Sequence, residues 1–182
     1  TMSDNTLISR AEPTLSEVQL NLLGWLRRDK PNIFLTGRAG TGKTTLMREL
    51  LRQAGNKAAV LAPTGVAAMQ AGGQTIHSFF HLPPRLITAR DIRKVRHSRV
   101  VKALETLVID EISMVRSDMM WAIDQSLRLN CECNEPFGGV QRVMVGELAQ
   151  LPPGVQGGEA EYLESTYGGT VFFKRHGGRG VS

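Results

Sequence analysis

The sequence predicts an α/β fold in which a parallel β-sheet is covered by helices on both faces. Short apolar runs alternate along the chain with stretches whose apolar residues recur at helical spacing. A glycine-rich loop also lies directly between the first apolar run and the next helical stretch. Strands that alternate with helices must run parallel, and their ligands bind at the carboxyl ends of the strands.

Four apolar runs predict strands, because each is short and is bounded by glycine, proline or polar residues. The predicted strands are residues 33–35, 58–61, 107–109 and 140–145. Four stretches of helical periodicity predict helices, each ended by a residue that disfavours the α conformation or marked by an apolar face. The predicted helices are residues 16–28, ended by Lys30-Pro31; 44–53, ended by Gly55; 66–71, ended by Gly72-Gly73; and one with the face Val115, Met119, Ile123 and Leu127.

Length and composition are those of one soluble globular domain, with 182 residues of which 41% are hydrophobic and 21% charged. No apolar run approaches the roughly 20 residues of a membrane span, and the polar leader before Pro13 is no secretory signal. We expect residues 1–13 to lie outside the fold and residues 14–182 to form the domain. The expected location is cytoplasmic, at the nucleoid in a bacterium, or nuclear or mitochondrial in a eukaryote.

Charge and cysteine content restrict the possible partners only weakly. The net charge of +5 is compatible with nucleic acid but does not require it. Cys131 and Cys133 are too few for a disulfide framework, and a single Cys-x-Cys lacks the second ligand pair of a zinc site.

The segment LTGRAGTGKTT has the phosphate-loop pattern in the context that the pattern demands, between a strand and a helix. Its glycines let backbone N–H groups turn inward around phosphate oxygens. Lys43 is placed to reach the β and γ phosphates of ATP, and the Thr44 hydroxyl to hold Mg²⁺. The alternative is a glycine-rich turn. The expected nucleotide-binding residues are Gly37, Ala39, Gly40, Thr41, Gly42, Lys43, Thr44 and Thr45.

The segment LVIDEIS places two carboxylates at the end of an apolar strand. A phosphate-loop protein needs a carboxylate there for its metal ion, and we assign Asp110 to Mg²⁺. Glu111 is placed to accept a proton from the attacking water, which favours hydrolysis over transfer to a second substrate. Alone, an Asp-Glu pair at a strand end would equally be a solvent-facing terminus.

Three further segments occur in the order of helicase motifs. They are VLAPTGVAA (residues 60–68) followed by GGQTIHSFF (72–80), DEISM (110–114), and PFGGVQRVMVGELAQLPP (136–153). Together with the phosphate loop, they resemble superfamily 1 DNA helicases of the PIF (petite integration frequency) and RecD group. The resemblance covers about residues 15–173 and implies the first RecA-like domain of an ATP-dependent motor that moves 5′ to 3′ on single-stranded DNA. It further implies service in DNA repair, recombination or telomere maintenance.

The same resemblance implies roles for individual residues. Gln150 would contact the γ phosphate and couple hydrolysis to strand movement, and Gln19 would read the adenine edge. Gln19 also fits a Ser-x-x-Gln capping box with Ser16, in which it only closes a helix start. The implied DNA contacts are Pro63, Thr64, Gly65, His77 and Phe79. For Phe79 and its neighbour Phe80, core packing is the competing interpretation, and we favour it for at least one of the two rings.

Several features leave alternatives open. The basic run from Arg90 to Lys102 is either a solvated helix face, which we favour, or a track for DNA phosphates. The family's Gly-Asp is Gly146-Glu147 here, and Gly154 replaces the valine after QLPP. Family members continue into a second RecA-like domain, which supplies an arginine for hydrolysis, and we expect this domain to be missing from the chain. The competing functions are a nucleotide- and DNA-binding module without movement, and a nucleotide kinase.

Overall fold

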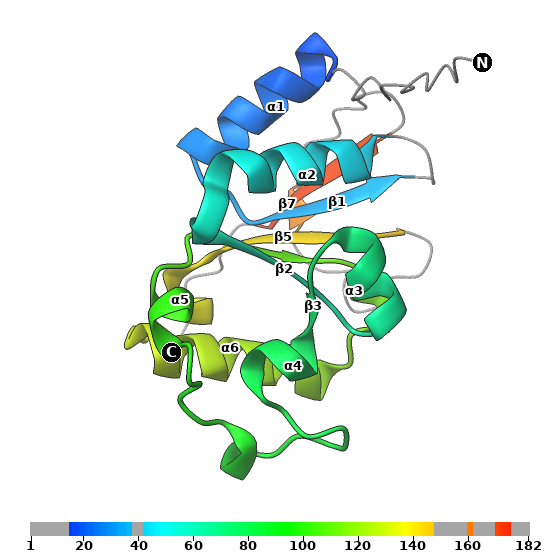
Figure 1. The fold of residues 1–182 in the computed structure, drawn as a ribbon. Helices are drawn as coiled ribbons and strands as arrows, with labels where there is room; N and C mark the ends of the chain where they lie inside the picture. Colours follow the sequence, from blue (N-terminus) through cyan, green and yellow to red (C-terminus); the bar gives the residue numbers. More distant parts are fainter. Residues whose placement is uncertain (1–14, 38–41, 148–159, 162–169, 176–182) are drawn as a thin grey trace, which may run out of the picture.

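The structure is a computed structural model that describes residues 15–37, 42–147, 160–161 and 170–175 (Figure 1). Within these residues seven strands form one sheet in the order β3-β2-β4-β5-β1-β7-β6. Its strands are β1 (Ile33–Gly37), β2 (Ala58–Ala62), β3 (Gln74–Thr75), β4 (Thr106–Ile109), β5 (Gln141–Gly146), β6 (Ala160–Glu161) and β7 (Thr170–Arg175).

Five of these strands, from β3 to β1 across the sheet, pair in parallel. Strand β7 pairs antiparallel with β1, and β6 pairs antiparallel with β7. The predicted parallel sheet is therefore confirmed for five strands, and all four predicted strands are among them. The antiparallel extension was not predicted, because its pairing joins segments far apart in the sequence, which local periodicity does not encode.

The helices are α1 (Glu17–Arg28), α2 (Lys43–Ala54), α3 (Gly65–Ala71), α4 (Ile76–Phe80), α5 (Ser98–Lys102) and α6 (Ser117–Cys131). The four predicted helices correspond to α1, α2, α3 and α6, although α6 begins after Val115. Helix α4 was not predicted, since five residues are too short for a visible period. The run from Arg90 to Lys102 is not one helix as predicted, because only its last residues form α5.

Helices cover both faces of the sheet, as predicted, with α1 and α2 on one side and α4 and α6 on the other (Figure 1). Alternate residues of β4 supply the two cores: Val108 packs with α1 and α2, whereas Leu107 and Ile109 pack with α4 and α6. All three side chains are fully buried. Burial of one such side chain contributes about 2 kcal/mol, so both helical layers are fixed to the sheet by the same strand.

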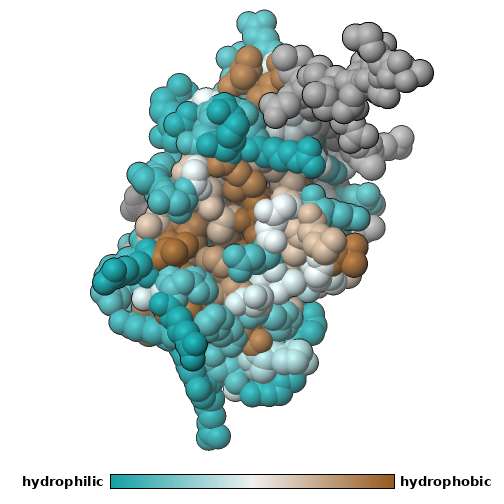
Figure 2. Space-filling view, viewed as in Figure 1, coloured by the Kyte–Doolittle hydropathy of each residue, from teal (hydrophilic) through white to brown (hydrophobic). Residues whose placement is uncertain are grey.

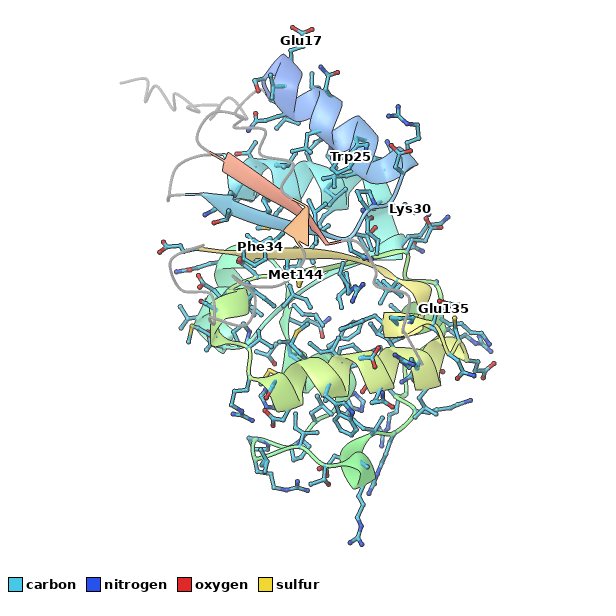
Figure 3. All side chains as sticks on the ribbon, turned by 180° about the vertical axis from the view of Figure 1, so that it is seen from behind. Glu17, Trp25, Lys30, Phe34, Glu135 and Met144 are labelled. Carbon is cyan, nitrogen blue, oxygen red and sulfur yellow. The ribbon has the colours of Figure 1, made fainter. Side chains whose placement is uncertain are left out.

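Hydrophobic and hydrophilic residues occupy different parts of the visible surface. Figure 2 shows hydrophobic colour in the middle of the molecule, where β2 and β3 lie in Figure 1, and hydrophilic colour over most of the surface around it. On the sheet itself, Phe34 of β1 and Met144 of β5 are register partners (Figure 3). Among the described residues, no helix combines the length and hydropathy needed to span a membrane.

The amino ends of the strands are held by buried polar groups. The Gln141 side chain donates from Nε2 to the carbonyl oxygens of Leu26 (3.0 Å) and Pro31 (2.9 Å). Its Oε1 accepts a hydrogen bond from the Thr106 hydroxyl at 2.8 Å. A side chain on β5 therefore joins β4, the end of α1 and the loop that leads into β1.

Candidate functional site

The carboxyl ends of the parallel strands bring together segments that are far apart in the sequence. Strand β1 leads into the phosphate loop, β2 into Thr64, β4 into Asp110 and β5 into Glu147. The ends are in register: Thr36 pairs with Gly146, and the Asp110 N–H donates to the Leu61 carbonyl at 2.8 Å. The sheet thus gathers Gly37, Thr64 and Asp110 along one edge, as the parallel order requires.

The structure describes the two ends of the phosphate loop. Ala39, Gly40 and Thr41 lie outside the described residues. Gly42 precedes the first residue of α2 with φ 85°, in the left-handed region. A Cβ at this position would also collide with Nε2 of Gln19. The backbone angle therefore favours glycine, as the phosphate-loop pattern predicts, whereas the end of the Gln19 side chain could move aside for a Cβ.

Lys43 opens α2 and lies at the centre of this edge. Its Nζ donates a hydrogen bond to the carbonyl oxygen of Gly37 at the end of β1. Burial raises the pKa of the Asp110 carboxyl group, and the positive charge of Lys43 is near enough to offset part of that rise. Thr44 is exposed and Thr45 partly buried on the first turn of α2. The ammonium, the hydroxyls and the helix N-terminus form the electropositive part of the site.

Asp110 supplies the acidic part. The side chain is half-buried directly after β4, and burial raises its pKa above the usual range for aspartate. The N–H of Glu111, which donates to Oδ1 at 2.9 Å, and the charge of Lys43 offset this shift only in part. Burial disfavours the ionised form of a carboxyl group, and a cation that binds beside it stabilises that form. The oxygen donors of Asp110 and Thr44 suit Mg²⁺, which prefers oxygen ligands.

Glu111 has an unusual backbone conformation. Its φ of 50° and ψ of 46° lie in the left-handed region, which a residue with a side chain adopts at a cost of about 1 kcal/mol or more. A short 3₁₀-helix, η3 (Ile112–Met114), follows it. The strain directs the chain sharply away from β4 at this point. The sequence predicted the role of this carboxylate but carried no signal for its conformation.

Gln19 makes both reciprocal contacts of the capping box. Its Oε1 accepts the Ser16 backbone N–H at 2.9 Å, and its own backbone N–H donates to the Ser16 hydroxyl at 3.2 Å. The capping-box interpretation is thus confirmed. Since Nε2 of the same side chain lies against Gly42, Gln19 is also beside the phosphate loop. Adenine contact remains a prediction.

The predicted DNA residues are divided between surface and core. Thr64 begins α3, where its hydroxyl accepts the Ala67 N–H at 3.2 Å, and Pro63 beside it is partly buried. Gly65 is exposed and His77 partly buried. The predicted DNA contact of Phe79 does not fit the structure, because the ring is buried. It packs edge-to-face on Phe80 with ring centroids 4.9 Å apart. Core packing accounts for both rings, and neither is open to a DNA strand.

Two further predictions concern the remaining motifs. Gln150 lies outside the described residues, whereas Glu147 is exposed just after β5.

In the basic run from Arg90 to Lys102, all six cationic side chains are exposed. Two of them share the carboxylate of Glu132, to which Lys94 and Lys102 donate at 2.9 and 2.8 Å. These lysines lower the pKa of Glu132 to about 2. This exposure fits both a solvated surface, which we favour, and a track for DNA phosphates, and the choice between them stays a prediction.

Comparisons with known proteins agree with this geometry. The family model described as PIF1-like helicase matches residues 23–180. The chain belongs to the PIF1-like helicase family. The Pif1 helicase of Bdellovibrio bacteriovorus is 35% identical over 157 residues, which are 83% of this chain and 36% of that protein. The chain thus spans about a third of this relative's length.

Solved structures of Pif1 from Bacteroides show the same fold. The complex with ADP-AlF4 aligns with a TM-score of 0.67 and 44% identity, covering 78% of this chain and 34% of that one. The structure bound to single-stranded DNA aligns with a TM-score of 0.66 and 43% identity, with the same coverage. These matches confirm the expected family and the RecA-like α/β fold. They cover the first part of a longer helicase architecture.

Proposed function

We propose that this chain is the first motor domain of a PIF1-like DNA helicase, which binds and hydrolyses ATP and couples hydrolysis to 5′-to-3′ movement on single-stranded DNA. One observation carries the proposal: Lys43, the half-buried Asp110 and the strained Glu111 lie together where the phosphate loop meets the strand ends. The Bacteroides Pif1 complexes with ADP-AlF4 and with single-stranded DNA support it by similarity.

Each residue of the site has a defined part in this proposal. Lys43 exchanges the Gly37 carbonyl for the β and γ phosphates of ATP. Asp110 and Thr44 hold Mg²⁺, which neutralises charge on the transferring phosphoryl group when bound. Glu111 accepts the proton of the attacking water.

The remaining residues contact other parts of the ligands in this proposal. Gln19 contacts the adenine, and Gln150 contacts the γ phosphate. Pro63, Thr64, Gly65 and His77 contact the DNA backbone next to the nucleotide.

The proposal is tested by removing Lys43, the lysine of the phosphate-loop pattern. Lys43→Ala should abolish binding of a fluorescent ATP analogue in the presence of Mg²⁺, because no other described side chain offers an ammonium to the phosphates at this edge. Lys57→Ala is the matched control, since Lys57 pairs with Glu105 at the opposite edge of the sheet. Equal affinity of Lys43→Ala and the parent would refute the phosphate-loop assignment.

We further propose that the 182 residues by themselves turn over ATP slowly and do not unwind DNA. An arginine from a second RecA-like domain stabilises the hydrolysis transition state in our proposal, and such an arginine is worth about 10³ to 10⁵ in rate. The test is strand separation of a duplex with a 5′ single-stranded tail, with protein shown to be monomeric by sedimentation. Robust ATP-dependent unwinding by the monomer would contradict this division of the motor.

A further inference from the structure

The turn that carries Glu111 packs directly on the end of β5. Gly146 is the last residue of β5, and a Cβ placed on it would lie 2.8 Å from Cγ2 of Ile112. The same Cβ would lie 3.6 Å from the Ile112 backbone nitrogen and 3.7 Å from Cζ of Phe34. A carbon–carbon approach of 2.8 Å is well inside the optimal separation of about 3.5 to 4.0 Å. Only glycine allows the strand and the turn to come this close.

Ile112 is held on two sides. Its Cγ2 points at the bare backbone of Gly146, and the residue packs against the buried cluster formed with α4 and α6. It directly follows Glu111, whose left-handed conformation persists only where the surroundings fix it. The packing of Ile112 is therefore well placed to hold the backbone of Glu111.

The other partner of the contact leads into a second predicted functional segment. Strand β5 runs through Gly146 to Glu147, and Gln150 follows three residues later. A group added at the β5 end on the side of η3 must displace Ile112, because a Cβ on Gly146 would already lie 2.8 Å from its Cγ2. The turn with the predicted general base and the end of β5 thus meet at Ile112 and Gly146.

We propose that Gly146 and Ile112 are positioning residues that set the place of the Glu111 carboxylate by the close approach of η3 to β5. The inference rests on the proposed function, because Glu111 needs an accurate position only if it activates water. A methyl group on Gly146 displaces Ile112 and with it the adjoining Glu111. Rates fall by up to about 100-fold when a reacting group is misplaced by 1 Å, whereas the phosphate loop that binds ATP is unchanged.

The test exchanges one methyl group across the contact. Gly146→Ala adds a methyl group next to Ile112, and Ile112→Leu removes the β-branch methyl Cγ2 while keeping the side-chain volume. We expect Gly146→Ala to lower the single-turnover rate of ATP hydrolysis about 10- to 100-fold, measured with protein in excess over ATP. Affinity for the fluorescent ATP analogue should stay within about 2-fold of the parent's value, since Lys43 is unaffected.

The double variant Gly146→Ala/Ile112→Leu should recover most of the lost rate, which a merely destabilised strand would not do. Gly24→Ala is the matched control, because nothing lies within 4 Å of a Cβ at Gly24, and it should hydrolyse ATP at the parent's rate. Glu111→Gln gives the scale for loss of the general base, about 10²-fold or more. Circular dichroism and thermal unfolding show whether each variant is folded.

The outcomes separate the inference from the proposed function. Hydrolysis by folded Gly146→Ala at the parent's rate, or no recovery in the folded double variant, overturns the inference alone. If Gly146→Ala does not fold, Ile112→Ala opens the same contact from the other side, and its hydrolysis at the parent's rate overturns the inference. A parent chain without hydrolysis that depends on Lys43 overturns the proposed function and the inference together.

Discussion

Polar groups are well paired at the amino ends of the strands and only partly paired at their carboxyl ends. We call these two sides of the sheet the amino edge and the carboxyl edge. At the amino edge, Gln141 satisfies two backbone carbonyls and the Thr106 hydroxyl, and Glu105 lies between Lys30 and Lys57. At the carboxyl edge, burial raises the pKa of Asp110, and Glu111 is strained. The same strands therefore end in a stabilising network on one side and, on the other, in a carboxylate whose burial is only partly compensated. This difference indicates that the carboxyl edge is built for ligands at the expense of stability.

The largest effect is expected from breaking the amino edge. Gln141→Leu keeps the side-chain volume but leaves the carbonyls of Leu26 and Pro31 and the Thr106 hydroxyl without their partner. Each unsatisfied buried group costs about 1 to 3 kcal/mol, so we expect a loss of roughly 2 to 5 kcal/mol of unfolding free energy. Urea denaturation measures this loss.

The control for Gln141→Leu is Gln70→Leu, at an exposed position of α3, which should change stability by less than about 0.5 kcal/mol. The folded fraction of Gln141→Leu should bind the fluorescent ATP analogue as the parent does, because the substitution is at the opposite edge from Lys43. A loss of less than about 1 kcal/mol would show that the amino-edge network is replaceable, and the contrast between the edges would weaken.

A smaller effect of opposite sign is expected at the carboxyl edge. Burial raises the folded-state pKa of Asp110 above its unfolded value, so the folded state keeps the proton to a higher pH. Stability then falls as pH rises through this window, and the cost is complete at neutral pH. Asp110→Asn removes the charge, while its Oδ1 can still accept the Glu111 N–H. This variant should therefore be more stable than the parent at pH 7.5.

The side chain of Asp110 is half-exposed, so solvent screens part of this cost. We expect the midpoint of thermal unfolding to rise by less than about 4 °C, the shift that 1 kcal/mol gives in a domain of this size. The difference between variant and parent should vanish below the unfolded pKa of 3.8, where both side chains are neutral. A variant less stable than the parent at pH 7.5 would mean that attraction to Lys43 outweighs burial.

The contrast between the edges also explains what the sequence could predict. The strands and longer helices follow from periodicity, and the phosphate loop and Asp110-Glu111 follow from residue type at a strand end. The sequence could not predict the left-handed conformation of Glu111 or the approach of Ile112 to Gly146, because both depend on packing between elements distant in the chain. Phe79 was misassigned for a related reason: a short motif shows an aromatic residue but not which way its helix faces.

The smallest effect is expected at the basic run, where the Glu132 carboxylate already pairs with two lysines. Glu132→Gln would release Lys94 and Lys102 while leaving the shape of the side chain nearly unchanged. If the run is a solvated surface, as we favour, binding of single-stranded DNA and its salt dependence should not change. If the run contacts phosphates, two released cations should tighten binding and steepen the plot of log affinity against log salt by about 1 to 2. Glu105→Gln is the matched control, because it releases Lys30 and Lys57 at the amino edge, away from the proposed DNA residues. Fluorescence anisotropy of a labelled oligonucleotide at several salt concentrations distinguishes the two cases.

A steeper slope of log affinity against log salt for Glu132→Gln but not for Glu105→Gln would extend the DNA site beyond the carboxyl edge and contradict our preference.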